Sequence, residues 1–216
     1  MGVGGILIKQ EKNNMSEEKV KEDINDQESN KNLNLTAMPT PNPNSIKFLM
    51  DFQFLPAGSL EFTDRDRAEK SLLPLRLLNI EGIEGVLVGT NFVSISKTSE
   101  SGWDTILEKA TDIIKATVGV ETPLIEVALI QKIEESMGDD DEIVKRIKEI
   151  LDHEIRPAIA MDGGDCRFVS FIEGVVTLEL QGACSSCPSA TMTLKMGIEN
   201  LLCKEIPEVK EVVQTV

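Results

Sequence analysis

Hydrophobic residues recur along this chain with two different spacings, and the changes between them predict its helices and strands. Four apolar residues in the stretch 103–118 lie at positions i, i+4, i+7 and i+8, namely Ile106, Ala110, Ile113 and Ile114. This spacing predicts an amphipathic helix, and a second helix is predicted over 65–73. Short apolar runs with the length of strands lie at residues 46–50, 86–88 and 92–95. The last two runs predict a hairpin, so we expect a small α+β domain over residues 38–124.

The last part of the chain predicts a second α+β unit, over residues 140–216. Five aliphatic residues mark the apolar face of a helix, namely Ile143, Ile147, Ile150, Leu151 and Ile155. Two apolar runs, 167–172 and 175–180, flank Glu173-Gly174, a pair suited to a two-residue hairpin turn. A further helix is predicted after Pro188, followed by a last strand over 208–213. The predicted order is therefore αββαβ.

Two segments lack this patterning. Residues 1–37 are rich in Asn, Glu, Lys, Gln and Ser, and such a segment buries too little apolar surface to offset the entropy cost of ordering. We therefore expect a disordered tail there. Residues 125–139 end in a charged, unpatterned run, which predicts a linker between the two domains.

The composition excludes several classes of function. The chain has 216 residues, of which 41% are hydrophobic, and its net charge is −15. An acidic surface repels phosphate backbones and anionic lipids, and an aromatic content of 4% leaves few platforms for base stacking. We therefore expect neither nucleic acid nor membranes as partners. All four cysteines lie in the last quarter of the chain, which favours a metal or redox site in a reducing compartment over a disulfide framework.

No targeting signal is evident at the start of the chain. The first apolar run is too short to span a membrane and has no basic flank. The leader is acidic and its first arginine is Arg65, whereas a mitochondrial presequence is typically rich in arginine and poor in acidic residues. These features predict a bacterial-type cytoplasmic protein without signal peptide, transit peptide or transmembrane segment. Met15 is an alternative start.

The sequence Gly-Ala-Cys-Ser-Ser-Cys-Pro at residues 182–188 is the strongest chemical signal in the chain. It places Cys184 and Cys187 at metal-ligand spacing between a predicted strand and a predicted helix, where the helix N-terminus favours thiolates. Closed zinc sites and common iron–sulfur clusters take four protein ligands. Further ligands would have to come from elsewhere in the chain, another copy or a partner. A dithiol redox pair and two packing cysteines are the alternatives.

A second motif, IRPAIAMDGGD, precedes the hairpin. Its adjacent glycines, Gly163 and Gly164, allow positive φ values and close backbone approach, so their N–H groups could face an anionic cluster or a partner's backbone. A plain helix-to-strand turn with aspartate caps is the alternative. Cys166 and Cys203 are expected to act as small apolar residues. The sole histidine, His153, is expected on a solvated helix face.

Both domains resemble those of one protein family. The segment from Ile143 to Val213 resembles the NifU-like C-terminal domain of Nfu iron–sulfur scaffold and carrier proteins, through IRPAIAMDGGD, FIEGVVTLEL, GACSSCPSATMTLKMGIENLL and IPEV. The first unit resembles that family's own N-terminal domain through TPNPNSIKF, LNIEGIEGVLVGTNFVSISK and the helix at Trp103. The chain departs from the family pattern at Cys166, where relatives usually carry an apolar residue, and over residues 71–75, where they have a tighter Ser-Pro-Leu.

The resemblance implies a function. It implies an iron–sulfur cluster, [4Fe-4S] in preference to [2Fe-2S], bridged between two chains by Cys184 and Cys187 of each. Asp162, Gly163 and Gly164 are expected to support these ligands from behind. The chain would be no enzyme: as a homodimer when loaded, it would receive a cluster from the assembly machinery and pass it to apo iron–sulfur proteins. The alternative from another class is a dithiol reductase or a persulfide-handling protein.

Overall fold

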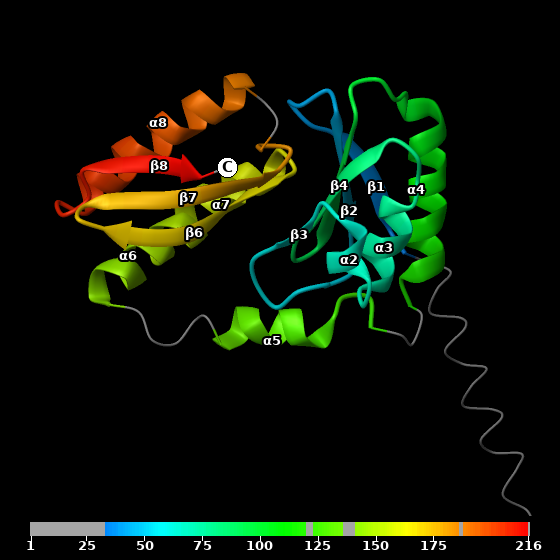
Figure 1. Cartoon of the computed structure of the whole chain (residues 1–216), viewed down its shortest axis with the longest axis horizontal. Coiled ribbons are helices and arrows are strands. Elements are labelled where there is room, and N and C mark those ends of the chain that lie inside the picture. Colours follow the sequence, from blue (N-terminus) through cyan, green and yellow to red (C-terminus); the bar gives the residue numbers. More distant parts are fainter. Residues whose placement is uncertain (1–32, 120–122, 136–140, 186–187, 216) are drawn as a thin grey trace, which may run out of the picture. The chain divides into compact units, whose positions relative to one another are not determined.

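The computed structural model describes residues 33–119, 123–135, 141–185 and 188–215. The chain folds into two α+β domains, as predicted (Figure 1). Residues from Leu33 onwards belong to one compact unit. Apart from its last five residues, 33–37, the predicted disordered tail lies outside the described residues.

The first domain is built on a sheet of five strands, in the order β1-β2-β5-β4-β3. The strands are β1 (Leu35–Pro39), β2 (Ser45–Met50), β3 (Leu60–Phe62), β4 (Ile83–Val88) and β5 (Phe92–Lys97). All neighbouring pairs are antiparallel. The predicted hairpin is β4–β5, with Val88 opposite Val93. β1 includes the last residues of the predicted tail, because Leu33 and Leu35 pack against the core of this domain.

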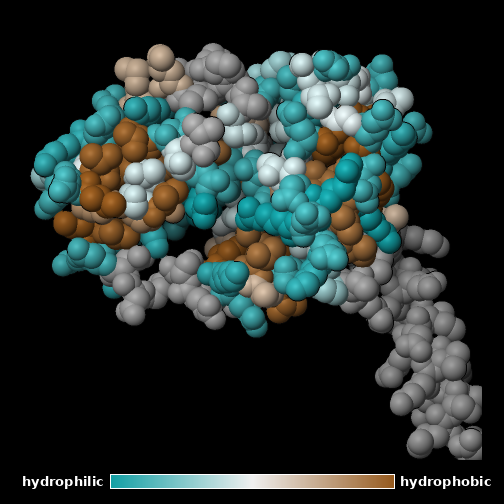
Figure 2. All heavy atoms as spheres, in the orientation of Figure 1, coloured by the Kyte–Doolittle hydropathy of each residue, from teal (hydrophilic) through white to brown (hydrophobic). Residues whose placement is uncertain are grey.

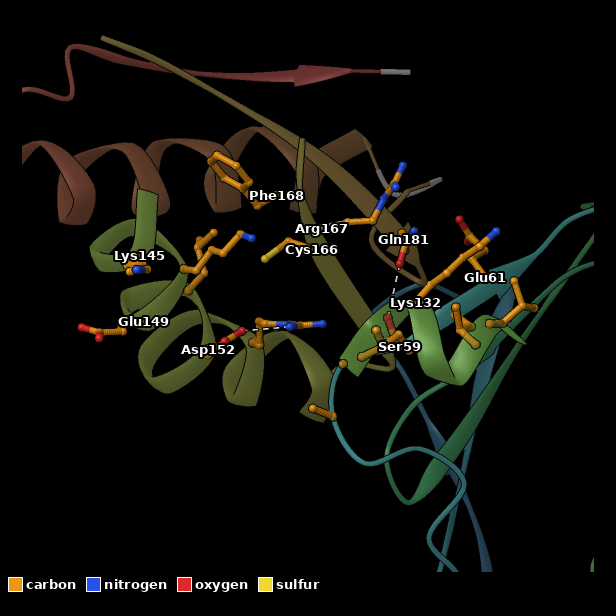
Figure 3. A pocket seen from close by; sticks show the side chains of 18 of the residues that line it. Ser59, Glu61, Lys132, Lys145, Glu149, Asp152, Cys166, Arg167, Phe168 and Gln181 are labelled. Carbon is orange, nitrogen blue, oxygen red and sulfur yellow. Dashed lines mark hydrogen bonds and ion pairs between the residues drawn. The ribbon is translucent and has the colours of Figure 1, made fainter. Parts of the chain in front are cut away.

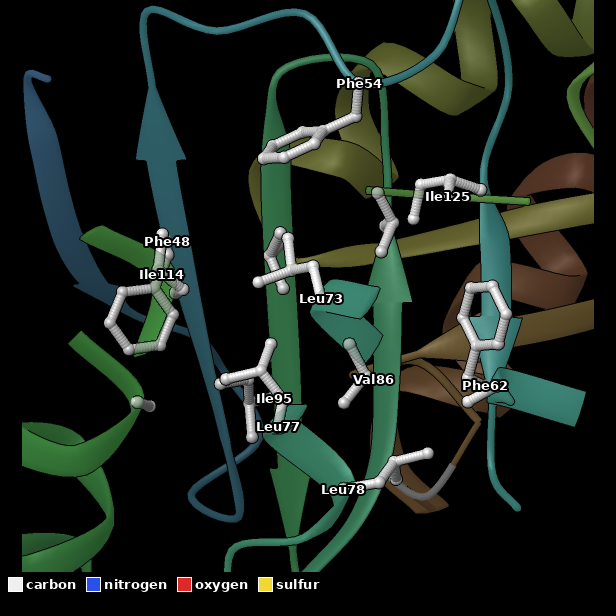
Figure 4. Close-up of a cluster of buried hydrophobic side chains, with 14 of the residues drawn as sticks. Phe48, Phe54, Phe62, Leu73, Leu77, Leu78, Val86, Ile95, Ile114 and Ile125 are labelled. Carbon is white, nitrogen blue, oxygen red and sulfur yellow. The ribbon is translucent and has the colours of Figure 1, made fainter. Parts of the chain in front are cut away.

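Three helices contribute to the core of the first domain: α2 (Arg65–Ala68), α3 (Leu72–Leu78) and α4 (Trp103–Thr117). Figure 4 shows Leu73 and Leu77 of α3 beside Val86 and Ile95 of the sheet. The single helix predicted over 65–73 is divided into α2 and α3. α2 ends at Ala68, whose carbonyl accepts a hydrogen bond from the Ser71 N–H at 2.8 Å, and a new helix starts after that turn.

Helix α5 (Val127–Glu135) lies within the segment that the sequence predicts as a linker. Its Leu129, Ile130 and Ile133 pack against the core of the first domain. Their spacing of one, three and four positions places them on one helical face. The charged run that follows them dominates the composition of this segment and conceals that short periodicity.

The second domain has the predicted αββαβ order. Its elements are α6 (Glu142–Ile150), the π-helical turn η2 (Leu151–Ile155), α7 (Arg156–Met161), β6 (Gly164–Ile172), β7 (Val175–Gly182), α8 (Pro188–Glu205) and β8 (Glu211–Thr215). The sheet order is β6-β7-β8, with β6 antiparallel and β8 parallel to β7. Glu173 and Gly174 both have positive φ, as their hairpin turn requires. Ile147, Leu178 and Leu202 lie in the core of this domain.

Strand β6 begins three residues earlier than the sequence predicts, at Gly164 instead of Arg167. The added residues extend the hairpin, so that Gly164 pairs with Gly182 and Cys166 with Leu180. The reason is that β7 also continues to Gly182, and its extra residues need a partner for their backbone N–H and C=O groups. The extension places the double-glycine motif beside the cysteine motif.

The surface is mostly hydrophilic in the view of Figure 2, in keeping with the net charge of −15. Hydrophobic residues also show on the second domain in this view. Val169 and Ile172 of β6 and Met196 of α8 are among the exposed large apolar residues. No helix among the described residues is both long and apolar enough to cross a membrane.

The packing of α8 yields a stability prediction. Leu202 is 0% exposed, whereas Met196 on the same helix is 58% exposed. Leu202→Ala is expected to destabilise the second domain by about 2–5 kcal/mol, because it leaves a cavity. Met196→Ala serves as the control and should change stability by less than about 0.5 kcal/mol. Amide hydrogen exchange of β7 measures this domain alone, and equal losses in the two variants would contradict the packing.

Candidate metal centre

Cys184 lies on the turn that follows β7. Gly182 ends the strand with φ of 63°, and Ser185 closes the turn by donating its backbone N–H to the Gly182 carbonyl at 3.1 Å. The Cys184 side chain is 6% exposed and belongs to the apolar core of the second domain. Cys187 lies outside the described residues, and α8 begins directly after it at Pro188. The predicted strand–turn–helix setting of the motif is therefore present.

The double-glycine motif supports the cysteine turn through its backbone. The Gly163 carbonyl accepts a hydrogen bond from the Ala183 N–H at 3.2 Å. A Cβ atom on Gly164 would overlap the Cys184 Sγ, so the sulfur occupies the space that any other residue would fill. Gly163 has φ of 77°, a conformation that favours glycine. Both glycines thus lie in contact with the cysteine turn.

Asp162, the third residue expected behind the ligands, is placed differently. It ends α7, donating its N–H to the Ile159 carbonyl at 3.0 Å, and its side chain is exposed. The negative charge of its carboxylate interacts electrostatically with Lys47 of β2. Burial lowers the pKa of Lys47, and the charge of Asp162 opposes that shift. Asp162 is therefore linked to the first domain by charge.

A buried ion pair holds the start of β6 against η2 and α7. The Arg156 guanidinium binds Asp165 with two hydrogen bonds, Nε to Oδ1 at 2.8 Å and Nη2 to Oδ2 at 2.6 Å. Its third nitrogen, Nη1, donates to Asp152 at 2.8 Å. Burial alone would lower the pKa of Arg156, but the two carboxylates raise it above its ordinary value. Asp165 Oδ1 also accepts from the Cys166 N–H, so the pair fixes the strand between the glycines and Cys166.

Arg156 and Asp165 have no predicted role, although both belong to the IRPAIAMDGGD motif. The signal was present: an arginine and an aspartate of opposite charge lie nine residues apart, on either side of a turn. Only the fold shows that the turn brings them into bidentate contact.

Cys166 is a buried thiol, as predicted. It is 1% exposed and packs in the core of the second domain. Burial, assisted by the charge of Asp165, raises the pKa of Cys166 to about 12. A thiol with this pKa stays protonated near neutral pH, whereas the thiolate is the form that binds metals. Cys203 packs against the same core. His153 is on the surface, with Nδ1 2.8 Å from the Glu149 carbonyl.

A cavity of about 820 Å³ lies on the other side of Cys166, lined by residues of both domains. Figure 3 shows the Cys166 sulfur directed towards it, and Ser59 linked to Gln181, with 3.3 Å between Oγ and Oε1. Within the described part of the chain, no three His, Cys, Asp or Glu side chains lie close enough together to hold a metal ion.

Two family models match the chain. One is described as scaffold protein Nfu/NifU N terminal and matches residues 35–119, the first domain. The other is described as NifU-like domain and matches residues 147–213, the second. Together they cover well over half of the chain and both of its domains.

Individual relatives agree with these models. A protein of Drosophila persimilis named NFU1 iron-sulfur cluster scaffold homolog, mitochondrial, is 41% identical over 176 residues, which are 81% of this chain and 62% of the relative. Its counterpart in Drosophila grimshawi is also 41% identical, over 81% of this chain and 59% of its own. The chain thus spans about three fifths of the length of these relatives.

Solved structures show weaker likeness. A NifU-like protein from Saccharomyces cerevisiae is 22% identical, covers 44% of this chain and 86% of its own, and has a TM-score of 0.38. A Staphylococcus aureus protein is 22% identical, covers 38% of this chain and 96% of its own, and has a TM-score of 0.35. Scores this low do not establish a shared overall fold.

The predicted location, a bacterial-type cytoplasm, is wrong by this comparison, because the relatives are named as mitochondrial. The prediction relied on the acidic composition of the leader. Such reasoning is indirect, since targeting signals are recognised by receptors and do not follow from the physics of the fold.

The ion pair beneath the cysteine turn can be tested. Arg156→Lys keeps the positive charge but loses the planar fork, so it can replace at most one of the two hydrogen bonds to Asp165, which is 7% exposed. We expect this substitution to destabilise the second domain by about 1–3 kcal/mol. The matched control is Arg167→Lys, because the Arg167 side chain is 63% exposed beside Glu179; it should cost less than about 1 kcal/mol. Hydrogen exchange of the β6 amides at increasing urea concentrations measures the loss of stability in each variant. Equal losses in the two variants would refute the role of the pair.

Proposed function

We propose, since the chain belongs to the Nfu family of iron–sulfur cluster scaffold proteins, that it binds an iron–sulfur cluster between two copies through Cys184 and Cys187 and passes it to apo-proteins. The observation that carries this proposal is the backbone cradle of Cys184. Gly164 leaves room for the sulfur and for nothing larger at that position. A cluster ligand needs such a fixed thiolate on a turn, because neighbouring backbone N–H groups stabilise its charge.

The ligand count supports sharing of the cluster. Common [4Fe-4S] and [2Fe-2S] clusters take four protein ligands, and one chain offers two in its motif. Cys166 is protonated and buried. Cys203 follows Pro188 by fifteen residues in the same helix, α8, which places it roughly 22 Å along the axis at 1.5 Å per residue. Neither completes the set, so a second copy is the source of the missing pair.

The proposed chemistry is ligand exchange. Each iron–sulfur bond to Cys184 or Cys187 is replaced by a bond to a cysteine of the acceptor, and a proton moves from the incoming thiol to the released thiolate. The iron keeps its oxidation state, so no oxidant or reductant is consumed. Ligands on a turn suit this exchange, because a turn can move to present its thiolates more readily than a strand or helix within the core. The chain then acts as a carrier without catalytic turnover. The assembly machinery loads it with a cluster, which we expect to be [4Fe-4S] in preference to [2Fe-2S].

Anaerobic reconstitution with iron and sulfide tests the proposal. The wild-type chain is expected to turn brown and to run as a dimer in light scattering, whereas the apo chain runs as a monomer. Cys184→Ser and Cys187→Ser should remain folded and bind no cluster, because each removes half of a chain's ligands. A cluster-loaded monomer would overturn the sharing of ligands. A colourless wild-type protein that reduces disulfides catalytically would instead support the dithiol reductase.

Cys166 supplies the matched control for these cysteine substitutions. Cys166→Ala and Cys166→Val remove a thiol that is protonated and packed in the core, at a cost of about 1 kcal/mol in stability. Both variants are expected to keep the iron and sulfide content of the wild type and to transfer cluster at a similar rate. An iron content halved in both, with unchanged circular dichroism, would make Cys166 a ligand.

A further inference from the structure

The strands β2, β4 and β5 of the first domain's sheet are largely buried on both faces. Phe48, Val86 and Ile95 point into the helix-covered core. Neighbouring residues on the same strands, Lys47 and Ser94, point to the opposite face because side chains alternate along a strand. They are nevertheless buried, and so is Leu87 between Val86 and Val88. A sheet face that carries a lysine and a serine is normally exposed to water. Because this face is buried, another part of the chain must cover it.

The cover of that face is the metal-site region of the second domain. A Cβ atom on Gly163 would lie 2.8 Å from the Ser94 Oγ and 3.4 Å from the Lys47 Cβ. A Cβ atom on Gly182 would lie 2.6 Å from the Leu87 Cδ2. The two glycines that frame the cysteine turn therefore also allow the first domain to approach it closely, which larger residues would prevent.

Side chains of the first domain bind the backbone of the cysteine turn directly. The Asn42 Nδ2 donates to the Ala183 carbonyl at 3.1 Å in a buried contact. Glu61 of β3 accepts the Gly182 N–H at 2.8 Å. These backbone groups belong to the two residues immediately before Cys184. The turn is thus held by an amide from one side and a carboxylate from the other.

Contacts beyond the turn continue the same interface. Lys47 donates to the Ala160 carbonyl in the last turn of α7 at 2.6 Å, where a positive charge is favourable. The Ser59 hydroxyl donates to Asp165, the partner of Arg156. Burial raises the pKa of Glu61, while the bond from Gly182 opposes that shift. Ser94 Oγ is the one described buried side-chain atom without a hydrogen-bond partner. The interface is therefore polar and mostly satisfied.

We infer that the first domain is a removable cover of the cysteine turn, held closed by Asn42 and Glu61, which must lift before Cys184 can bind or release a cluster. The inference rests on the proposed function for its consequence, but not for its geometry. The first domain binds the backbone of the two residues before Cys184, and Cys184 is 6% exposed with its side chain in the core of the second domain. While these contacts hold the turn in place, its thiol cannot meet the cysteines of a second copy or of an acceptor. Asn42 and Glu61 each hold the cover by a single hydrogen bond of modest net strength. A protein that donates or accepts the cluster can therefore open the cover by competing for these hydrogen bonds.

The inference gives the first domain a role that needs no metal ligands. That domain contains neither Cys nor His over residues 38–124. By covering Cys184 in the apo chain it would protect the thiol from oxidation and delay loading until the cover opens. The backbone groups that Asn42 and Glu61 release become free to bind a partner.

The rate at which iodoacetamide alkylates Cys184 in the apo full-length chain tests this inference. Fragmentation mass spectrometry separates Cys184 from the other thiols. Asn42→Asp keeps the oxygen that accepts the Asn44 N–H but replaces the donor to Ala183 with a second acceptor. Glu61→Ala removes the acceptor of the Gly182 N–H. Each variant is expected to raise the rate on the order of tenfold, since each leaves a buried polar group unpaired.

Two matched controls accompany these variants. Asn34→Asp makes the same chemical change at a site where the amide binds Asp51 of its own domain, and Glu61→Gln keeps an oxygen for Gly182. Both should leave the rate within about twofold of the wild type. Wild-type alkylation as fast as in guanidinium-unfolded chain would overturn the cover. So would unchanged rates in both Asn42→Asp and Glu61→Ala, with circular dichroism showing folded protein.

The experiment also separates the cover from the proposed function. Alkylation is measured without iron, so the cover can be confirmed or refuted even if no cluster binds. In reconstitution, Asn42→Asp should load cluster faster than wild type and reach the same iron content. Slower loading with the same final content would contradict the cover, because it would make Asn42 an aid to loading.

Discussion

The close approach of two backbone segments is the constraint on which the second domain depends. Gly164 pairs with Gly182 across β6 and β7, and Gly163 accepts the Ala183 N–H. Because neither Gly163 nor Gly182 has a side chain, the two segments can also approach the sheet of the first domain closely. Gly164 leaves the space that the Cys184 sulfur occupies, whereas Gly163 and Gly182 allow close contact with the first domain.

A charged pair stabilises this arrangement from beneath. Asp165 follows Gly164 directly, and its carboxylate is bound by Arg156 and accepts the Cys166 N–H. A buried pair of this kind adds little net stability, but its geometry is specific. Its effect is to fix where β6 starts. That start decides which residue faces Cys184, so the pair acts on the site through position.

The two domains divide the work. In the proposed function, the second supplies the two cysteines of the motif, and its backbone surrounds Cys184. The first supplies a sheet whose second face carries Lys47 and Ser94 beside Leu87. Polar groups on that face suit the proposed opening of the contact. Exposing them to water costs less free energy than exposing apolar side chains would. The relatives named as cluster scaffolds contain segments similar to both domains, which is consistent with a joint role.

The sequence by itself determined the elements with long, regular periodicity. The hairpins, α4, the helical stretch from α6 and the αββαβ order were predictable because each depends on spacing within one segment. The cysteine motif and the double glycine were visible for the same reason. Short elements were missed: β1, β3 and α5 have too few residues for a pattern to stand out from their polar neighbours.

Only the tertiary structure decided what these motifs meet. Asn42 and Ala183 are 141 positions apart, and Arg156 and Asp165 face each other only because a turn reverses the chain. The burial of Cys166, with its raised pKa, also depends on residues from several elements. The physical reason is that periodicity records which side of its own helix or strand a residue occupies. It does not record which distant surface covers that side, because hydrogen bonds and close packing depend on positions in space.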